Sequence, residues 1–402
     1  MRHLPGIGHW VLPTLALKLA VTALTVVLLS EDARYFLVWS GRLTEQLWQH
    51  PGAWLRMLPT DEFHQGRWHL VFHGYSNTFF LLKVLSVLNL ASLGNALLTA
   101  AYLSVANFVA AWELVRVLRL RWPAAPAAAG VVALLLWPTV LYWTSGLTKE
   151  SLLVGSGYVV LALVLRLAYG TAPARLGLVG LGLLAAAVLH FKMRYFLAIV
   201  LLGVLAALGL VRALQALGAV RRWWGQLLVV AGFLLGSAWA VSEVSPVFRA
   251  NKFTSQLLRN YSVLVKTSRG RPHLEYPSLV PTTASAMQHA PLAIVNTLTR
   301  PWPWERGRFL YTLASIENLL LLLTLATAIV AVARRRPGYL PFVLVLALLL
   351  YCGTLAALLG LTTPNLGTLN RYRVTFLPFL LLLLLQNDYA ARILRRLEKS
   401  EE

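Results

Sequence analysis

The chain has 402 residues, of which 58% are hydrophobic and 13% charged, and its mean hydropathy is +0.66. This composition excludes a soluble globular protein and is typical of a chain that crosses a membrane many times. The formal net charge is +21, and the single cysteine, Cys352, lies in an apolar stretch, which excludes a disulfide framework.

A helix needs about 20 apolar residues to cross a bilayer. Stretches of this length, or slightly shorter, recur along the chain. They lie at 9–29, 94–115, 124–145, 150–169, 175–191, 195–211, 225–244, 310–333, 338–360 and 372–386. The stretch 77–90 is apolar but short and contains Lys83, so it predicts an interfacial or re-entrant helix. The sequence thus predicts an all-α polytopic membrane protein with about ten transmembrane helices, forming one unit over residues 1–402.

Lys and Arg are distributed unevenly over the short loops. With a cytoplasmic N-terminus, the inner loops hold Arg2, Arg116, Arg119, Arg121, Arg166, Arg175, Arg212, Arg221, Arg222, Arg334, Arg335, Arg336, Arg392, Arg395, Arg396 and Lys399. The short outer loops then hold only Lys149, Lys192, Arg194, Arg371 and Arg373. Because cations are enriched in cytoplasmic loops, we expect both termini inside.

Two long loops fall on the outer face in this topology. Residues 31–76 are amphipathic and rich in Trp, so we expect outer-face helices that lie along the membrane surface. Residues 245–309 form a long basic loop whose segment Arg300-Pro301-Trp302-Pro303-Trp304 is too rich in Pro for a regular helix. Trp302 and Trp304 are candidates for stacking on a sugar, although anchoring at the interface is the commoner use of such residues.

An acidic pair, Glu31–Asp32, directly follows the first predicted span in a chain with only 15 acidic residues. Such a pair can cap the next helix, form a solvated boundary charge, or supply a general base. A second pair, Asp61–Glu62, lies in the same outer loop, where solvated charge is the simpler interpretation.

Three further polar groups fall on the predicted outer face, at 144–150, 190–194 and 365–373. Their charged members are Lys149, Glu150, Lys192, Arg194, Arg371 and Arg373. Each cation alone is explained by snorkelling to lipid headgroups, and Lys149–Glu150 could be an internal ion pair. Their convergence predicts a basic outer cavity for a phosphorylated lipid or glycan.

Other sites have little support. The sequence contains no G-x-x-x-x-G-K-[ST], G-x-S-x-G or H-E-x-x-H motif, so ATP-driven and hydrolase functions are not indicated. His69 and His73 have the spacing of one helix face but lack a third ligand, and His190 is expected to be a hydrogen-bonded boundary residue. We expect no metal, no cofactor and no nucleic-acid partner.

Two motifs resemble those of a known superfamily. Asp32-Ala33-Arg34-Tyr35 resembles the first-loop acidic motif of the GT-C superfamily of polyprenyl-phosphate-sugar-dependent glycosyltransferases, as in bacterial protein-mannosyltransferase-like members. The segment 137–150 resembles a P-S-x-x-x-W-x-S-G-x-x-K-D/E stretch of bacterial GT-C-like proteins, with Thr139 in place of Ser. The chain lacks the large C-terminal outer domain of some members.

The resemblance implies an inverting transferase on the outer face of a bacterial cytoplasmic membrane. Asp32, with Glu31 as its competitor, would be the base, and Lys192, Arg194, Arg371 and Arg373 would bind the lipid phosphate. The partners would be a polyprenyl-phosphate-linked sugar, a glycan or lipid acceptor, and the bilayer. The alternatives are an O-antigen-polymerase-type enzyme and a lipid-linked-glycan flippase. A flippase fits less well because Lys18, Glu113 and Glu317 are the main charges inside the predicted spans.

Overall fold

The computed structural model describes residues 6–170, 176–244, 249–305 and 309–398, without the side chains of Phe309 and Leu310. The first part of the chain forms η1 (Gly8–Trp10), α1 (Val11–Val27), α2 (Glu31–Gln49), α3 (Pro51–Met57), β1 (Glu62–Gln65), β2 (Trp68–Val71), α4 (Asn77–Ser92) and α5 (Ala96–Arg121). The middle part forms α6 (Ala127–Val131), η2 (Val132–Leu136), α7 (Pro138–Trp143), α8 (Lys149–Tyr169), α9 (Leu176–Met193), α10 (Tyr195–Ala216) and α11 (Trp223–Val244). The last part forms α12 (Ala250–Thr267), α13 (Thr283–Thr299), α14 (Phe309–Ala333), α15 (Phe342–Thr362), α16 (Leu366–Arg373), α17 (Leu377–Leu385), α18 (Asp388–Leu394) and η4 (Arg395–Leu397).

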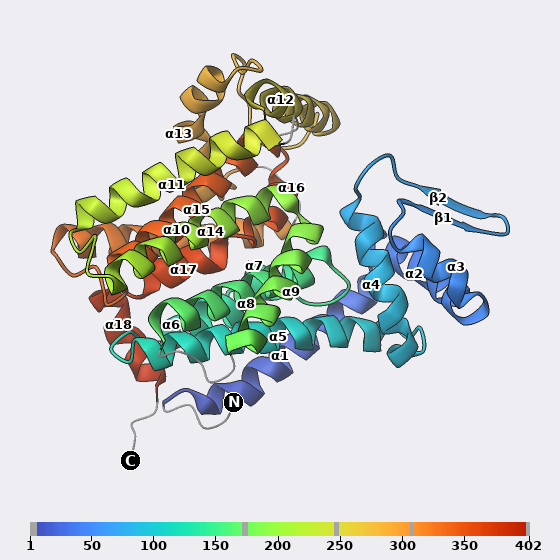
Figure 1. Ribbon diagram of the computed structural model, residues 1–402, viewed down its shortest axis with the longest axis horizontal. Helices are drawn as coiled ribbons and strands as arrows, with labels where there is room; N and C mark the ends of the chain where they lie inside the picture. The colour runs from blue at the N-terminus through green and yellow to red at the C-terminus, as the bar shows by residue number, and fades with distance from the viewer. Residues whose placement is uncertain (1–5, 171–175, 245–248, 306–308, 399–402) are drawn as a thin grey trace.

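The protein is an all-α polytopic membrane protein, as predicted. Within the described ranges, eight helices are long and apolar enough to cross a membrane, and the pair α16–α17, bent by 62°, makes nine if it is one span. Figure 1 shows these helices gathered in one bundle, with α2, α3, α4 and the β1–β2 hairpin at one end of it.

The predicted count of about ten spans is too high as a count of unbroken helices. The predicted span 124–145 is divided into α6, the π-helical turn η2 and α7, with Trp137 extended at φ −60° and ψ 124°. Pro138 causes the break because it lacks an N–H and disfavours helical backbone at the preceding residue.

The segments near the two termini lie at the same end of the bundle. Trp10 donates from Nε1 to the Leu397 carbonyl at 3.0 Å, and the backbone N–H of Ala128 donates to Glu398 Oε1 at 3.0 Å. These contacts hold Trp10 beside Leu397, and the location of both termini on the cytoplasmic side stays a prediction. Of the cations that support the orientation, Arg2, Arg175 and Lys399 lie outside the described residues.

The segment 31–76, predicted to be an outer loop, forms a second hydrophobic core with α4 and part of α5. Phe36 and Leu43 of α2 pack with Leu81, Leu82 and Leu85 of α4, and all five are buried. The loop also contains an antiparallel hairpin that the sequence did not predict, with Glu62 paired to Val71 and Gln65 to Trp68. The helical spacing of His69 and His73 is therefore misleading, because His69 lies in a strand.

The long basic loop forms α12 and α13, except that residues 245–248 and 306–308 lie outside the described part of the chain. The backbone N–H of Leu274 donates to the Pro364 carbonyl at 2.9 Å, and His273 forms a β-bridge with Asn365. These bonds attach the connection between α12 and α13 to the start of α16, which carries Arg371.

Candidate functional site

The corner between α1 and α2 sets the position of Asp32. Ser30 is the N-cap of α2, and its Oγ accepts from the Ala33 N–H at 3.2 Å. Ser30 therefore supplies the side-chain cap, while Glu31 and Asp32 lie in the first turn of α2, where their charges interact favourably with the helix dipole, as considered for the acidic pair. The Asp32 side chain remains available for another contact and is 56% exposed.

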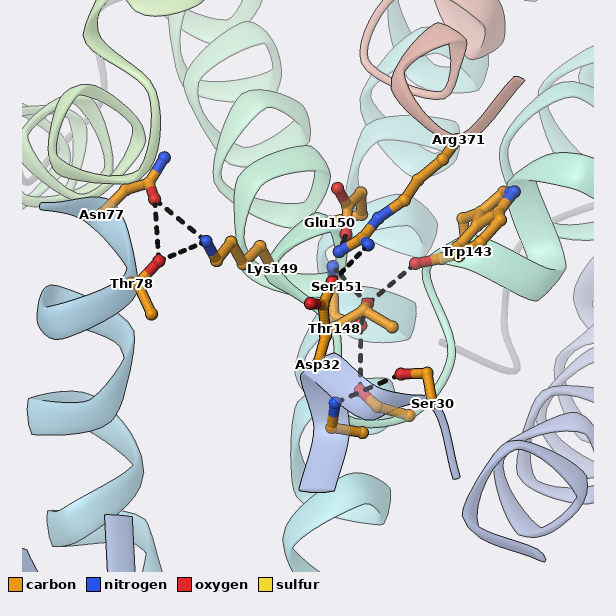
Figure 2. Close-up of polar contacts among 12 residues, drawn as sticks. Ser30, Asp32, Asn77, Thr78, Trp143, Thr148, Lys149, Glu150, Ser151 and Arg371 are labelled. Carbon is orange, nitrogen blue, oxygen red and sulfur yellow. Dashed lines mark hydrogen bonds and ion pairs between the residues drawn. The ribbon is translucent and has the colours of Figure 1, made fainter. Parts of the chain in front are cut away.

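Arg371 of α16 joins two acids from different parts of the chain (Figure 2). It donates from Nη1 to Asp32 Oδ2 at 2.6 Å and from Nη2 to Glu150 Oε2 at 3.0 Å. Its guanidinium carbon also lies 5.3 Å from the ring centroid of Trp143, within cation–π range. The guanidinium is thus held in one orientation by two charges and an aromatic face.

Glu150 is fully buried in the first turn of α8. Thr148 caps this helix by accepting from the Ser151 N–H at 3.2 Å. The preceding turn requires Gly146, whose φ is +89° and where an added Cβ would lie 2.3 Å from Thr25 Oγ1 of α1. This close approach of α1 to the turn brings the start of α8 beside the start of α2.

Arg194, between α9 and α10, is the fourth member of the cluster. Its Nη2 lies 3.7 Å from Glu150 Oε1, and its guanidinium carbon lies 3.8 Å from the ring centroid of Tyr372. Asp32, Arg371, Glu150 and Arg194 form a continuous chain of alternating charge, which we call the charge relay chain.

Lys149 points away from its neighbour Glu150. Its Nζ donates to Asn77 Oδ1 at 3.1 Å and to Thr78 Oγ1 at 2.6 Å, at the start of α4 (Figure 2). The suggested internal ion pair between Lys149 and Glu150 is absent from the bonds formed by the described residues. Lys149 instead attaches α8 to the outer-loop core.

A cavity of about 700 Å³ adjoins the charge relay chain. It is lined by Arg194, Tyr372 and Asn77. Arg194 therefore belongs both to the charge relay chain and to the cavity wall. Apolar side chains make most of its remaining wall, including Phe196, Leu257, Leu264, Leu358 and Leu359. A cavity with a cationic end and an apolar wall has the chemistry to hold an amphiphile with an anionic head.

Tyr75 lines the same cavity and is connected to Lys192. Its hydroxyl donates to the Lys192 carbonyl, while the Lys192 Nζ lies 4.7 Å from the Tyr75 ring centroid. Burial and, second, the charge of Asp61 raise the pKa of the Tyr75 phenol to about 12, so it is a neutral donor at pH 7. Lys192 is exposed beside the cavity and does not line it.

Arg373 has a different environment from Arg371. Its side chain is 1% exposed and donates from Nη1 to Asn318 Oδ1 at 2.9 Å and to the carbonyls of Thr297 and Arg300, each at 3.2 Å. These bonds connect α16 to α13 and α14, which favours a structural role rather than contact with a ligand.

The remaining candidates lie apart from the charge relay chain. Trp302 and Trp304 stack on each other, with centroids 5.0 Å apart and planes at 7°, and neither lines the cavity. Glu31 is exposed, and within the described residues its side chain forms no hydrogen bond or ion pair. His190 is buried, with Nδ1 3.0 Å from Ser156 Oγ and 2.9 Å from the Leu153 carbonyl, as expected for a hydrogen-bonded histidine. Glu62 of the second acidic pair contacts His64 at 3.2 Å on the hairpin.

No protein-family model, curated protein or solved structure matches the chain.

The sequence alone indicated the charged residues of the site but missed most of the cavity. Tyr75, Asn77, Arg259 and Tyr372 contribute polar groups to its wall. The amphipathic pattern of 250–267 could have indicated α12 as a wall helix, whereas nothing local connects Tyr75 or Asn77 to Arg194.

Proposed function

We propose that the protein is a glycosyltransferase that moves a sugar from a polyprenyl-phosphate-linked donor to a glycan or lipid acceptor. The observation that carries this proposal is the chain of contacts from exposed Asp32, through Arg371 and Glu150, to Arg194 on the cavity wall. Through Arg371 and Glu150 it connects one accessible carboxylate, which does not itself line the cavity, to a wall that combines a guanidinium with apolar side chains. The resemblance of the Asp32 motif and of segment 137–150 to the GT-C superfamily supports the same reaction.

The donor lies in the cavity in this proposal. Arg194 binds the phosphate, because a guanidinium pairs with phosphate oxygens through two parallel hydrogen bonds. The polyprenyl chain lies along the apolar residues of α10, α12 and α15 that line the cavity. This arrangement needs no soluble nucleotide, in agreement with a sequence that has no nucleotide motif.

Asp32 acts on the acceptor. Its carboxylate takes the proton of the acceptor hydroxyl, and the hydroxyl oxygen forms a bond to the anomeric carbon of the sugar. The bond from that carbon to the phosphate oxygen breaks, and the lipid phosphate leaves with the electron pair. Arg194 stabilises the negative charge that develops on the phosphate, and Arg371 holds Asp32 in position.

We place the reaction on the outer face of a bacterial cytoplasmic membrane. Most Lys and Arg residues of the short loops lie at the end of the bundle opposite the site. Because cations are enriched in cytoplasmic loops, this distribution favours that opposite end as the cytoplasmic one. Trp10 and Leu397, which lie near the two termini in sequence, contact each other at that opposite end.

A transport function has less support because the charges within the spans have partners inside the protein. Lys18 donates to Thr144 Oγ1 at 2.8 Å, Glu113 pairs with Arg116 at 2.8 Å, and Glu317 accepts from Thr139 Oγ1 at 2.6 Å. These contacts connect helices or stabilise one helix and do not form a charged path across the bundle. An O-antigen-polymerase-type reaction would also use outer arginines but would not depend on Asp32.

The test combines binding with transfer, using the full chain in lipid nanodiscs. Native mass spectrometry should detect undecaprenyl phosphate bound about ten- to a hundredfold more tightly than undecaprenol, since charged hydrogen bonds contribute about 1.5–3 kcal/mol. A hexose linked to undecaprenol through a phosphate or a diphosphate should then release undecaprenyl phosphate or diphosphate, respectively, when membrane glycans are supplied as acceptors. Equal binding of undecaprenol and undecaprenyl phosphate would contradict the proposal.

A further inference from the structure

A second cation lines the cavity on the side formed by α12. Arg259 contributes to the wall together with Gln256 and Asn260 of the same helix. It is exposed, and within the part of the chain that the structure describes no acidic side chain pairs with it. Arg194 enters the same cavity from the junction of α9 and α10.

The charges around the cavity do not balance. Asp32 and Glu150 are matched by Arg371 and Arg194 within the charge relay chain. Lys149 forms hydrogen bonds only to the neutral groups of Asn77 and Thr78. Arg259 is therefore a cation on the cavity wall with no carboxylate partner among the described residues, and Lys149 and Lys192 add positive charge beside the cavity.

A sugar linked to a lipid through one phosphate carries a single negative charge, because that phosphorus is a diester. A diphosphate linkage carries two, one on each phosphorus. Two guanidinium groups, those of Arg194 and Arg259, line the cavity from separate parts of the chain, and each can bind one phosphate of the second linkage.

We propose that the donor joins its sugar to the lipid through a diphosphate, and that Arg259 binds the phosphate that Arg194 does not. This inference rests on the proposed function and names the donor class of the same cavity. During transfer the bond between the anomeric carbon and the diphosphate oxygen breaks. The leaving lipid diphosphate keeps the electron pair and gains one negative charge, while the acceptor's proton passes to Asp32.

The experiment compares undecaprenyl phosphate, undecaprenyl diphosphate and undecaprenol as ligands of the full chain in nanodiscs. The two phosphorylated lipids differ by one negative charge, as do the corresponding sugar-linked donors. The wild-type protein should bind the diphosphate about tenfold or more tightly than the monophosphate. Arg259→Gln should remove this preference while binding of the monophosphate changes little.

Two controls lie on the same helix. Lys252 and Lys266 are seven residues before and after Arg259, about 10 Å along the axis, are exposed, and do not line the cavity. Lys252→Gln and Lys266→Gln remove the same charge and should keep the preference for diphosphate.

The outcomes separate this inference from the proposed function. Equal affinity for the two phosphorylated lipids, or equal losses for both in Arg259→Gln, would overturn the diphosphate assignment and leave the transferase proposal standing. Loss of the preference in the two lysine variants would show that general surface charge is responsible and would also overturn it. If neither phosphorylated lipid binds better than undecaprenol, the proposed function itself fails.

Discussion

The guanidinium of Arg371 contacts the carboxylate of Asp32 at 2.6 Å across 339 residues of sequence. The contact joins the first turn of α2 to the short helix α16 near the end of the chain. The 62° bend between α16 and α17 gives α16 a different direction from the apolar helix that follows it. The residue proposed as the base is therefore positioned by the last part of the fold.

The first prediction separates the two acids of the pair. Asp32→Asn should lower sugar transfer about 10²–10⁴-fold, because the amide cannot accept the proton. Folding should be nearly unaffected, since Ser30 caps α2 and a solvent-exposed ion pair contributes about 0–1 kcal/mol. Glu31→Gln is the matched control, measured by transfer rate beside thermal unfolding. Near-native transfer by Asp32→Asn with loss in Glu31→Gln would make Glu31 the base.

The second prediction concerns adjacent cations with different surroundings. Arg194 lines the cavity, whereas Lys192 lies outside it against Tyr75. Arg194→Ala should weaken binding of undecaprenyl phosphate by about 1.5–3 kcal/mol, the contribution of a charged hydrogen bond. Lys192→Ala should have a much smaller effect in the same titration. A larger loss for Lys192→Ala would mean that the phosphate binds outside the cavity.

The third prediction concerns stability. Glu150 is fully buried between Arg371 and Arg194, so Glu150→Gln leaves two guanidinium groups with only Asp32 as counter-ion. Removing one partner of a buried ion pair costs about 3–5 kcal/mol, and thermal unfolding in detergent should detect the loss. Glu275→Gln, at a residue that is 68% exposed, is the control and should unfold like the wild type. An unchanged melting temperature for Glu150→Gln would show that the chain of charges does not stabilise the fold.

The fourth prediction tests the turn before α8. Gly146→Ala should destabilise the protein by about 1–3 kcal/mol, because of the positive φ and the clash with Thr25. Adding Thr25→Ala should recover the part that comes from the clash. Gly209→Ala, where an added Cβ meets nothing within 4 Å, should cause no loss. A Gly146→Ala protein with wild-type stability would contradict the assigned geometry.

The fifth prediction tests the orientation in the membrane. In a Cys352→Ser background, a cysteine at the exposed Ser255 of α12 should react with an impermeant maleimide in intact spheroplasts. A cysteine at the exposed Ala219, between α10 and α11, should react only after permeabilisation. The reverse pattern would place the cavity on the cytoplasmic side.

The sequence alone was sufficient for the membrane class and for most helix positions, because a long apolar run is a local property. The predicted 150–169 and 195–211 correspond to α8 and α10, and the short stretch 77–90 to α4. The interrupted span around Pro138 was predicted as one continuous helix, because its apolar residues are numerous enough for a crossing and the single proline was not treated as a break. The β1–β2 hairpin was missed because its strands are only four residues long and contain His and Gln.

The candidate site was partly predictable for a related reason. The distribution of charge over the loops predicted that Asp32, Glu150, Arg194 and Arg371 lie on the same side of the membrane. It could not predict which of these side chains contact one another. Residues two apart on a helix point in nearly opposite directions, so Arg371 reaches the acids while Arg373 turns into the bundle.

What the sequence by itself determined is that this chain lies in a membrane, and its short-loop charges predicted that the clusters at 31–32, 149–150, 192–194 and 371–373 share one face. Only the tertiary structure decided which of those charges meet, that Lys149 turns to Asn77 instead of Glu150, and that α12 lines the cavity with Arg259. The physical reason is that hydropathy and loop charge are properties of contiguous stretches of sequence. Ion pairs and cavity walls instead depend on the packing of helices far apart in the sequence.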